Sequence, residues 1–314
     1  MLEKSAKLVV FGGAGLVGQN LVALLKTEGY SRIVVVDKHA SNLAILRRLN
    51  PEVETFLADM AEPGPWEDCI EGAAAVVMLQ AQIGGTSKGE FYRNNVVSTQ
   101  RALAACARHG VPYLVHASSS VTKSIVRDPY TESKKEQESI VVASGLASAI
   151  LRPTLMFGRF DRKHLGWLAR FMQRVPVFPI PGSGRFMRQP LYVVDFCRII
   201  LSCLERREQG GSYNITGRER IDYVDMIRAI RRVIGAKAVL VHVPYRLFWW
   251  LLKAYAVIDR DPPFTTSQLE ALVAPDEFEV IPWWEIFGVP ATPFAEAIEE
   301  AFGSGPYCDV VLEF

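Results

Sequence analysis

Apolar residues in the first half of the chain fall into short runs that are separated by stretches with helical spacing. The runs lie near residues 7–11, 32–37, 53–58, 74–79, 112–118 and 147–152. Short runs rich in Val, Ile and Leu are typical of strands that are buried on both faces, and the intervening stretches are long enough for crossover helices. Such alternation joins parallel strands through right-handed connections. The pattern therefore predicts an α/β fold with a doubly wound parallel sheet.

The pattern becomes less regular after residue 155. Pro176, Pro179 and Pro181, together with Gly182 and Gly184, predict loops that cross over a site.

Later segments resemble the first domain again, because the run Leu191–Asp195 is followed by a helical stretch and by a strand at Ser212–Ile215. A helix at 222–234 and a strand at Val239–Val243 follow. The expected organisation is a first domain over 1–155, to which 190–215 returns, and a smaller interleaved lobe formed mainly by 156–314.

A strongly apolar stretch, Arg246–Ile258, predicts a helix that is hydrophobic on nearly every face, with two adjacent tryptophans and one cation near each end. The stretch is too short to span a bilayer, which needs about twenty apolar residues. Three interpretations remain open: a core helix, the wall of a pocket or a dimer surface, and a helix that lies in a membrane interface.

Composition excludes some classes of function. The chain has 314 residues, a formal charge of +1 and 49% hydrophobic residues, so it can bury a large core but has no basic footprint for nucleic acid. Its five cysteines lack metal-binding spacing, so we expect free thiols and no metal site. The polar start of the chain is too short for a signal peptide, and we expect a cytoplasmic protein.

A glycine-rich loop follows the first predicted strand and precedes a helix. Gly12 permits a tight turn, Gly15 lets the backbone approach a pyrophosphate, and Gly18 lets the helix pack against the strand. The second strand ends at Asp37, about twenty residues beyond the glycines, where a carboxylate can accept the ribose hydroxyls of an adenosine. Because that acid would repel a 2′-phosphate, the loop predicts an NAD site, with NAD favoured over NADP.

Tyr130 and Lys134 stand four residues apart in a predicted helix that runs to Ser144. This spacing puts both side chains on one helix face, where the ammonium can lower the pKa of the phenol. A tyrosine with a lowered pKa can act as a general acid or base near neutral pH. Upstream, the strand Tyr113–Ala117 ends in three serines at positions 118–120. These residues together predict a proton-transfer site.

In this order the motifs resemble the extended short-chain dehydrogenase/reductase family, also called the NAD-dependent epimerase/dehydratase family, over nearly the whole chain. The resemblance implies a Rossmann-type fold, and it rests on the glycines, Asp37, Asp59 after the third strand, Asn95, the serines, Tyr130, Lys134 and the segment Arg152–Gly158. A C-terminal part with Trp283 and Trp284 is similar to the branch that contains an accessory subunit of respiratory complex I, in which the fold binds a dinucleotide without necessarily turning over a substrate.

The resemblance also implies roles for individual residues. Ser119, with Ser120 as the fallback, would polarise the reacting oxygen, Tyr130 would exchange its proton, and Lys134 would hold the nicotinamide ribose. Asn95 joins this catalytic group, although a polar residue on a solvated helix face is an open alternative for it. The implied cofactor-binding residues are Gly12, Gly15, Leu16, Val17, Gly18, Asp37, Asp59 (at the adenine), Met60, Leu79, Gln80, Ala81, Tyr130, Lys134 and Pro153.

The substrate stays open between two classes. Dehydratases of this family carry an Asp-Glu pair after the catalytic serine, and this chain has Ser120-Val121 there, so loss of water is the least expected reaction. Arg188 matches the family arginine that clamps the diphosphate of a nucleotide-sugar. Leu155, however, stands where nucleotide-sugar members carry asparagine, as in members that act on sterols and other apolar alcohols.

The leading hypothesis is an NAD-dependent dehydrogenase or epimerase that acts on a nucleotide-sugar, with Ser120, Leu155 and Arg188 at the substrate. The alternatives are the same chemistry on an apolar alcohol, as in 3β-hydroxysteroid dehydrogenases, and an NAD-binding scaffold without turnover. We also expect a homodimer with a small-molecule substrate and no nucleic-acid partner, while a membrane surface remains a less favoured partner.

Overall fold

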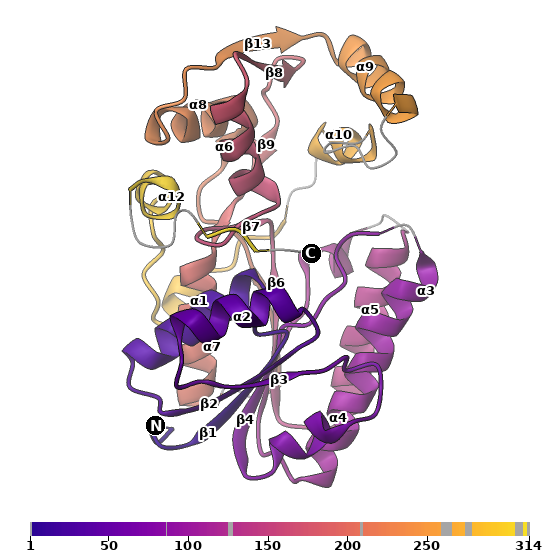
Figure 1. The fold of residues 1–314 in the computed structure, drawn as a ribbon, viewed down its shortest axis with the longest axis vertical. Coiled ribbons are helices and arrows are strands. Elements are labelled where there is room, and N and C mark those ends of the chain that lie inside the picture. Colours follow the sequence, from indigo (N-terminus) through magenta and orange to yellow (C-terminus); the bar gives the residue numbers. More distant parts are fainter. Residues whose placement is uncertain are drawn as a thin grey trace.

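The computed structural model describes residues 2–85, 87–124, 128–207, 210–258, 266–273, 278–304 and 310–312. Its centre is a seven-stranded sheet with the order β11-β6-β5-β4-β1-β2-β3, in which all neighbours are parallel (Figure 1). The strands are β1 (Lys7–Phe11), β2 (Arg32–Asp37), β3 (Glu54–Leu57), β4 (Ala73–Met78), β5 (Leu114–Ala117), β6 (Ser148–Pro153) and β11 (Gly211–Ile215). The direction of winding reverses between β1 and β4, and ligands bind at such a switch point in open α/β sheets.

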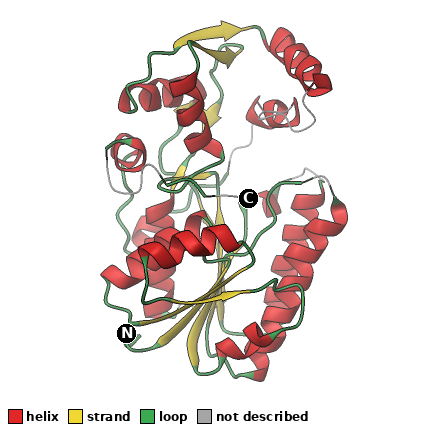
Figure 2. Cartoon of the chain, in the orientation of Figure 1, coloured by secondary structure: helices red, strands yellow, loops and turns green. Residues whose placement is uncertain are grey.

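Helices cover both faces of this sheet, as the cartoon in Figure 2 shows. On one face lie α1 (Leu16–Thr27), α2 (Ala40–Leu49) and α7 (Val193–Arg206), and on the other lie α4 (Ser98–Arg108), α5 (Pro129–Ala143) and the short helix η1 (Pro65–Ile70). Helix α12 (Phe294–Phe302) packs against α8 (Tyr223–Val233) of the lobe. Successive residues of β1 point to opposite faces, so Leu8 and Val10 enter one core and Val9 and Phe11 enter the other. The predicted doubly wound α/β fold is confirmed.

Residues 190–215 contribute to the sheet domain. Helix α7 packs against α1, and β11 pairs with β6 at the sheet edge. The chain thus crosses into the lobe and comes back before the sheet is complete. The domain boundary at residue 155 stays a prediction.

The lobe lies beyond the carboxyl ends of the strands, at the far end of the molecule in Figure 1. It contains α6 (His164–Arg174), β8 (Val177–Pro181), β9 (Met187–Arg188), β12 (Ile221–Asp222), α8 (Tyr223–Val233), β13 (Val239–Val243), α9 (Tyr245–Ile258) and α10 (Thr266–Val273). Between the lobe and the sheet, β7 (Met156–Phe157) pairs with β10 (Leu191–Tyr192).

The expectation of loops at the lobe prolines is partly wrong. Pro179 and Pro181 lie within β8, which pairs in parallel with β13, and only Pro176 precedes the strand. A proline cannot donate a hydrogen bond to a neighbouring strand, but among the described residues β13 is the one strand that pairs with β8. The edge of β8 that faces away from β13 needs no backbone N–H donors, so prolines are tolerated on that edge.

The core-helix interpretation of the apolar stretch is also wrong. The stretch forms α9 as predicted, yet none of the residues 245–256 is buried. Within the described ranges, no helix combines the length and the apolar character that crossing a membrane requires.

Candidate functional site

The glycine loop follows β1 at the switch point and leads into α1. Gly12 has φ +70°, and a Cβ on it would lie 2.6 Å from the backbone nitrogen of Gln80, which follows β4. A Cβ on Gly18 would lie 2.2 Å from the carbonyl oxygen of Gly13, so these two glycines are required by the packing of the protein itself. A Cβ on Gly15, in contrast, would meet only the Gly12 carbonyl oxygen, at 3.5 Å.

The open space at Gly15 suits a ligand. Gly15 is the N-cap of α1 and gives its first turn no side-chain cap, so backbone N–H groups are available to an anion there. These features fit the pyrophosphate of a dinucleotide over the loop.

Asp37 ends β2 beside the same loop, and its side chain is only 6% exposed. The Oδ2 accepts a hydrogen bond from the Ala14 backbone N–H at 3.0 Å, and the Oδ1 accepts one from the His39 backbone N–H at 3.0 Å. The Oδ1 also pairs with the His39 Nδ1 at 2.9 Å, whereas the Oδ2 can accept a further bond. The carboxylate is therefore held against the loop, where a ribose contact is geometrically reasonable.

Asp59 follows β3 and is bound by a residue that the sequence analysis did not single out. Its Oδ2 accepts a hydrogen bond from Arg93 Nη1 at 2.8 Å, and its Oδ1 accepts one from the Ala61 backbone N–H at 2.9 Å. Partial burial raises the pKa of Asp59, but the Ala61 and Arg93 bonds outweigh it and the net pKa is lowered. Asp59 is thus a charged anchor for Arg93, which also binds Glu62.

The other predicted cofactor residues lie around the carboxyl ends of the strands. Leu16 and Val17 open α1, Leu79, Gln80 and Ala81 follow β4, and Pro153 ends β6. Met60 differs, because its side chain is buried in the core on the α4–α5 side of the sheet. Met60 can therefore offer a ligand its backbone rather than its side chain.

Tyr130 lies in the first turn of α5. The Asp128 side chain caps this helix by accepting from the Thr131 N–H at 2.8 Å, and Pro129 occupies the first helical position. The Tyr130 ring lies 6.1 Å from that of Phe91, centroid to centroid. Burial raises the pKa of Tyr130, Asp128 raises it further, and a hydrogen bond with Ser119 lowers it only in part.

Lys134 does not lower the pKa of Tyr130 as expected. Its Nζ donates to the Ala117 carbonyl oxygen at 3.1 Å and to the Gln137 Oε1, and the side chain is fully buried. Burial lowers the pKa of Lys134 to about 7, although Glu138 opposes this. Burial therefore disfavours the ammonium form of Lys134, which reduces but does not remove its ability to stabilise a phenolate.

The three serines have different environments. Ser118 donates to Glu138 at 2.5 Å, and Glu138 in turn accepts from the buried Arg152 Nε at 3.1 Å, so Ser118 belongs to an ion-pair network. Ser120 is buried and opens the short helix η3 (Ser120–Lys123). Ser119 is the serine that acts on Tyr130, because it lowers the pKa of the phenol. The geometry therefore favours Ser119 over the fallback Ser120.

Asn95 is fully buried, so the interpretation as a residue on a solvated helix face is wrong. It lies in a π-helical turn, η2 (Tyr92–Val97), a feature that is often found at functional sites. Its Oδ1 accepts from the Gln82 backbone N–H at 2.7 Å, and its Nδ2 donates to the Ser133 Oγ at 2.9 Å. Asn95 thus fastens the loop after β4 to α5 beside Lys134.

A buried network extends from Lys134 to the cofactor side of the sheet. Gln137, which accepts from Lys134, donates to the Thr99 Oγ1 at 2.8 Å, and Gln80 donates to the same oxygen at 3.5 Å. Gln137 and Thr99 are not among the residues predicted from the sequence. Their only signal was their spacing on helices next to Lys134 and Asn95.

At the lobe, Arg188 lies in β9 and is half-buried. Its Nη1 donates to the Met187 carbonyl oxygen at 3.0 Å, and its charge opposes the burial that raises the pKa of Tyr223. Arg185, three residues earlier, is exposed and forms an ion pair with Asp222 at 2.9 Å. Leu155 is half-buried just beyond β6. The substrate-binding roles of Arg188 and Leu155 stay predictions.

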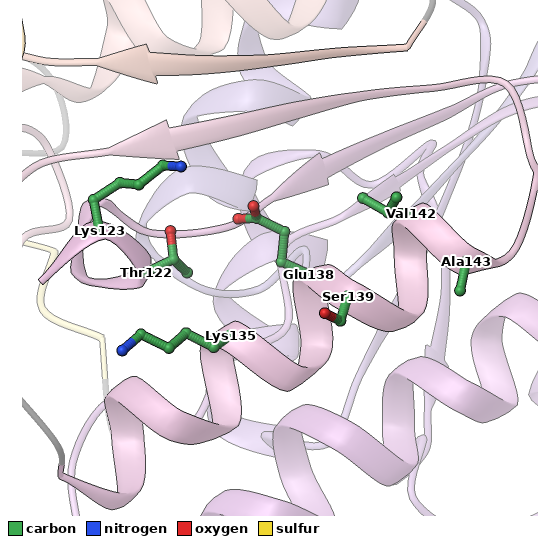
Figure 3. A pocket seen from close by; sticks show the side chains of 7 residues that line it. All are labelled: Thr122, Lys123, Lys135, Glu138, Ser139, Val142 and Ala143. Carbon is green, nitrogen blue, oxygen red and sulfur yellow. The ribbon is translucent and has the colours of Figure 1, made fainter.

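A surface pocket of about 360 Å³ lies on α5 beside η3 (Figure 3). It is lined by Thr122, Lys123, Lys135, Glu138, Ser139, Val142 and Ala143. Its lining includes none of the predicted site residues, so it is separate from the Ser119–Tyr130 pair.

Comparisons with known proteins agree with this geometry. The family model described as "NAD dependent epimerase/dehydratase family" matches residues 8–216. The 2-alkyl-3-oxoalkanoate reductase of Stenotrophomonas maltophilia is 25% identical over 93% of this chain and 97% of its own length. The decarboxylating sterol-4-alpha-carboxylate 3-dehydrogenase of Mus musculus is 24% identical over 80% of this chain and 75% of its own.

Among solved structures, the UDP-glucuronic acid 4-epimerase from Bacillus cereus in complex with NAD has the same fold. The two chains superpose with a TM-score of 0.70 at 21% identity, over 94% of this chain and 97% of the other.

Proposed function

Because this chain belongs to the NAD-dependent epimerase/dehydratase family, we propose that it oxidises a secondary alcohol or reduces a ketone with NAD, or epimerises a carbon through these two steps. The observation that carries the proposal is the convergence of three residues at the carboxyl edge of the sheet. Ser119 follows β5 and lowers the pKa of the Tyr130 phenol, and the buried Lys134, one turn beyond Tyr130 on α5, binds the Ala117 carbonyl oxygen of β5. The fold alone would not indicate this function, because one fold can carry many activities.

NAD, when bound, supplies the hydride acceptor or, in its reduced form, the donor. The residues that would hold it are the glycine loop, Asp37 at the adenosine ribose, and Lys134 at the second ribose. Gly15 supports this placement, because it leaves room at the switch point and the uncapped start of α1 offers backbone N–H groups to a phosphate. The relative from Bacillus cereus, whose structure contains NAD, has the same fold.

The chain's own residues handle the proton. Since the pKa of Tyr130 is raised, the phenol keeps its proton at neutral pH and is ready to donate it to a substrate oxygen during reduction. Ser119 polarises the same oxygen by donating a hydrogen bond. In the oxidative direction, Tyr130 must first lose its proton, which a cationic Lys134 would favour.

For the substrate, we favour a nucleotide-sugar. Arg188 supports this, because a half-buried guanidinium at the lobe offers charge-assisted bonds to a diphosphate. The Bacillus cereus relative, by its name, acts on a UDP-sugar.

An apolar alcohol or ketone is the second candidate, and Leu155 favours it. By the family resemblance, this leucine stands where nucleotide-sugar members carry an asparagine that bonds the diphosphate. The names of the Stenotrophomonas maltophilia and Mus musculus relatives indicate an alkyl oxoalkanoate and a sterol carboxylate as their substrates.

Turnover by the purified protein tests the proposal. NADH absorbance should change with either UDP-sugars or apolar secondary alcohols and ketones, and UDP-sugar epimers can be separated by chromatography. Ser119→Ala should lower the rate strongly, while Ser120→Ala should retain most of it. A protein that binds NAD but turns over neither class would support the scaffold hypothesis instead.

A further inference from the structure

Helix α9 carries an outward-facing apolar stripe at one end of the molecule. Leu247, Trp250, Leu251 and Tyr255 are 52%, 62%, 56% and 46% exposed. Together with Ala254 they follow the spacing i, i+3, i+4, i+7 and i+8, which normally faces a core. On α9 this spacing faces outward.

The opposite face of α9 already has its partners. Tyr245, Phe248, Trp249 and Leu252 follow the same helical spacing and are half-buried. The Trp249 Nε1 donates to Glu270 of α10 at 3.0 Å, and α9 and α10 pack together. These half-buried residues therefore account for the packing of α9 against the lobe. The outward stripe is an additional apolar surface.

Cations border the outward stripe. Arg246 and Lys253 are exposed and seven residues apart, which places them along one side of the stripe. The Lys253 Nζ lies 4.8 Å from the ring centroid of Trp249 and 5.4 Å from that of Trp250. The sequence of α9 contains no aspartate or glutamate. Apolar and aromatic side chains edged by cations are typical of helices that lie in the surface of an anionic bilayer.

A second apolar surface lies at the same end of the lobe. Val177 of β8 pairs in register with Val239 of β13, and Val241 lies two residues further on the same face. These side chains are 48%, 59% and 41% exposed. Figure 1 shows β13 and α9 together at the end of the molecule that is farthest from the sheet.

We propose that this end of the lobe docks on an anionic lipid surface, with the α9 stripe inserted at the level of the headgroups and Arg246 and Lys253 bound to lipid phosphates. A second copy of the chain fits less well. A two-fold symmetric interface places the same patch on both sides, so the cations of one copy would face those of the other with no acid on α9 to balance them.

Vesicle flotation with the full chain tests the proposal. The wild type should float with vesicles of phosphatidylcholine that contain one quarter phosphatidylglycerol, and it should float less with pure phosphatidylcholine or at high salt. Trp250→Glu and Leu251→Glu should each weaken binding about tenfold or more, because a charge then replaces an inserted apolar group. Lys253→Glu should weaken binding only to the anionic vesicles.

The matched control is Val142→Glu, which places the same charge on a side chain of α5 that is 64% exposed. It should bind vesicles like the wild type. Circular dichroism checks that each variant is folded, and Lys253→Glu keeps the test informative if an apolar variant fails to fold. The proposal is wrong if the wild type does not float with anionic vesicles, or if Trp250→Glu binds them as well as the wild type does. It is also wrong if light scattering shows a wild-type dimer that Trp250→Glu separates while vesicles remain unbound.

Discussion

The Nζ of Lys134 donates to the Oε1 of Gln137, one turn further along α5, and both side chains are fully buried. Gln137 is itself held by Thr99, so an amide and a hydroxyl position the lysine beneath the site. Lys134 is therefore oriented from inside the protein, independently of Tyr130.

Gln137 should control the protonation of Lys134. Gln137→Glu places a carboxylate beside the ammonium and should raise the pKa of Lys134 from its value of about 7 by roughly one unit or more. A pH–rate profile should then show the limb assigned to Lys134 shifted to higher pH. Glu136→Gln changes an exposed neighbour on the same helix and should leave the profile in place. An unshifted limb in Gln137→Glu would show that Lys134 does not govern it.

Lys134 should also impose a pH dependence on stability. Its pKa falls from 10.5 to about 7 on folding, so between these values the unfolded chain binds the extra proton and stability rises with pH. Below pH 7 the buried charge costs stability in full. Lys134→Met should lack this contribution, with a slope difference of up to about 1.4 kcal/mol per pH unit, and be the more stable variant at pH 6. Urea unfolding of both proteins across this range measures the difference, and parallel curves would contradict the burial of a titrating lysine.

Tyr130→Phe should keep NAD binding nearly intact and lower turnover by about two orders of magnitude or more, the usual scale for a lost general acid or base. The control is Tyr92→Phe, which removes the hydroxyl of a tyrosine that is 45% exposed. Stopped-flow measurement of substrate reduction gives the turnover of both variants once a substrate is identified. Full activity in Tyr130→Phe would exclude the phenol as the proton donor.

Asp37 should make the protein select NAD over NADP, because its buried carboxylate at the glycine loop would repel a 2′-phosphate. Calorimetric titration should give tighter binding for NAD, and Asp37→Asn should narrow the difference between the two cofactors. Asp68→Asn changes an exposed carboxylate on η1 and serves as the control. If the wild type binds NAD and NADP with equal affinity, Asp37 does not lie at the adenosine ribose.

Arg188 separates the two substrate classes. If the substrate carries a diphosphate, each charge-assisted bond contributes about 1.5–3 kcal/mol, and Arg188→Ala should weaken UDP binding more than tenfold with NAD binding unchanged. Arg185→Ala removes a nearby arginine that is already paired with Asp222 and should have little effect. Saturation-transfer NMR with UDP measures both. If the wild type does not bind UDP, the apolar substrate becomes the better candidate.

The sequence predicted the sheet domain well because its strands and its glycine loop are each recognised from residues that are adjacent in the chain. The bounds of β2 and of β13 coincide with the predicted runs, and the glycine loop lies where strand, turn and helix require it. The pairing of Ser119 with Tyr130 follows from the end of one strand and the start of the next helix. Such features need only neighbouring residues to be recognised.

The rest depends on contacts between distant segments. Gln137 binds Lys134 locally, but the burial that lowers the pKa of that lysine comes from packing across several elements, including the β5 carbonyl of Ala117. The apolar pattern of α9 predicted burial, yet only tertiary structure could show that the side chains of its outer stripe are exposed. Hydrophobic spacing indicates that a helix face tends to be buried, but it does not identify the element or surface that buries it.

The place of β11 at the edge of the sheet has a consequence for biosynthesis. As the ribosome releases the chain, β1 to β6 can assemble early, but β6 keeps an unpaired edge until Gly211–Ile215 has emerged. Unpaired strand edges can join other chains, so the nascent protein is prone to aggregation over the whole time in which residues 154–210 are synthesised. A chaperone that shields this edge would act in that interval, and a truncated product that ends within the interval would carry the exposed edge permanently.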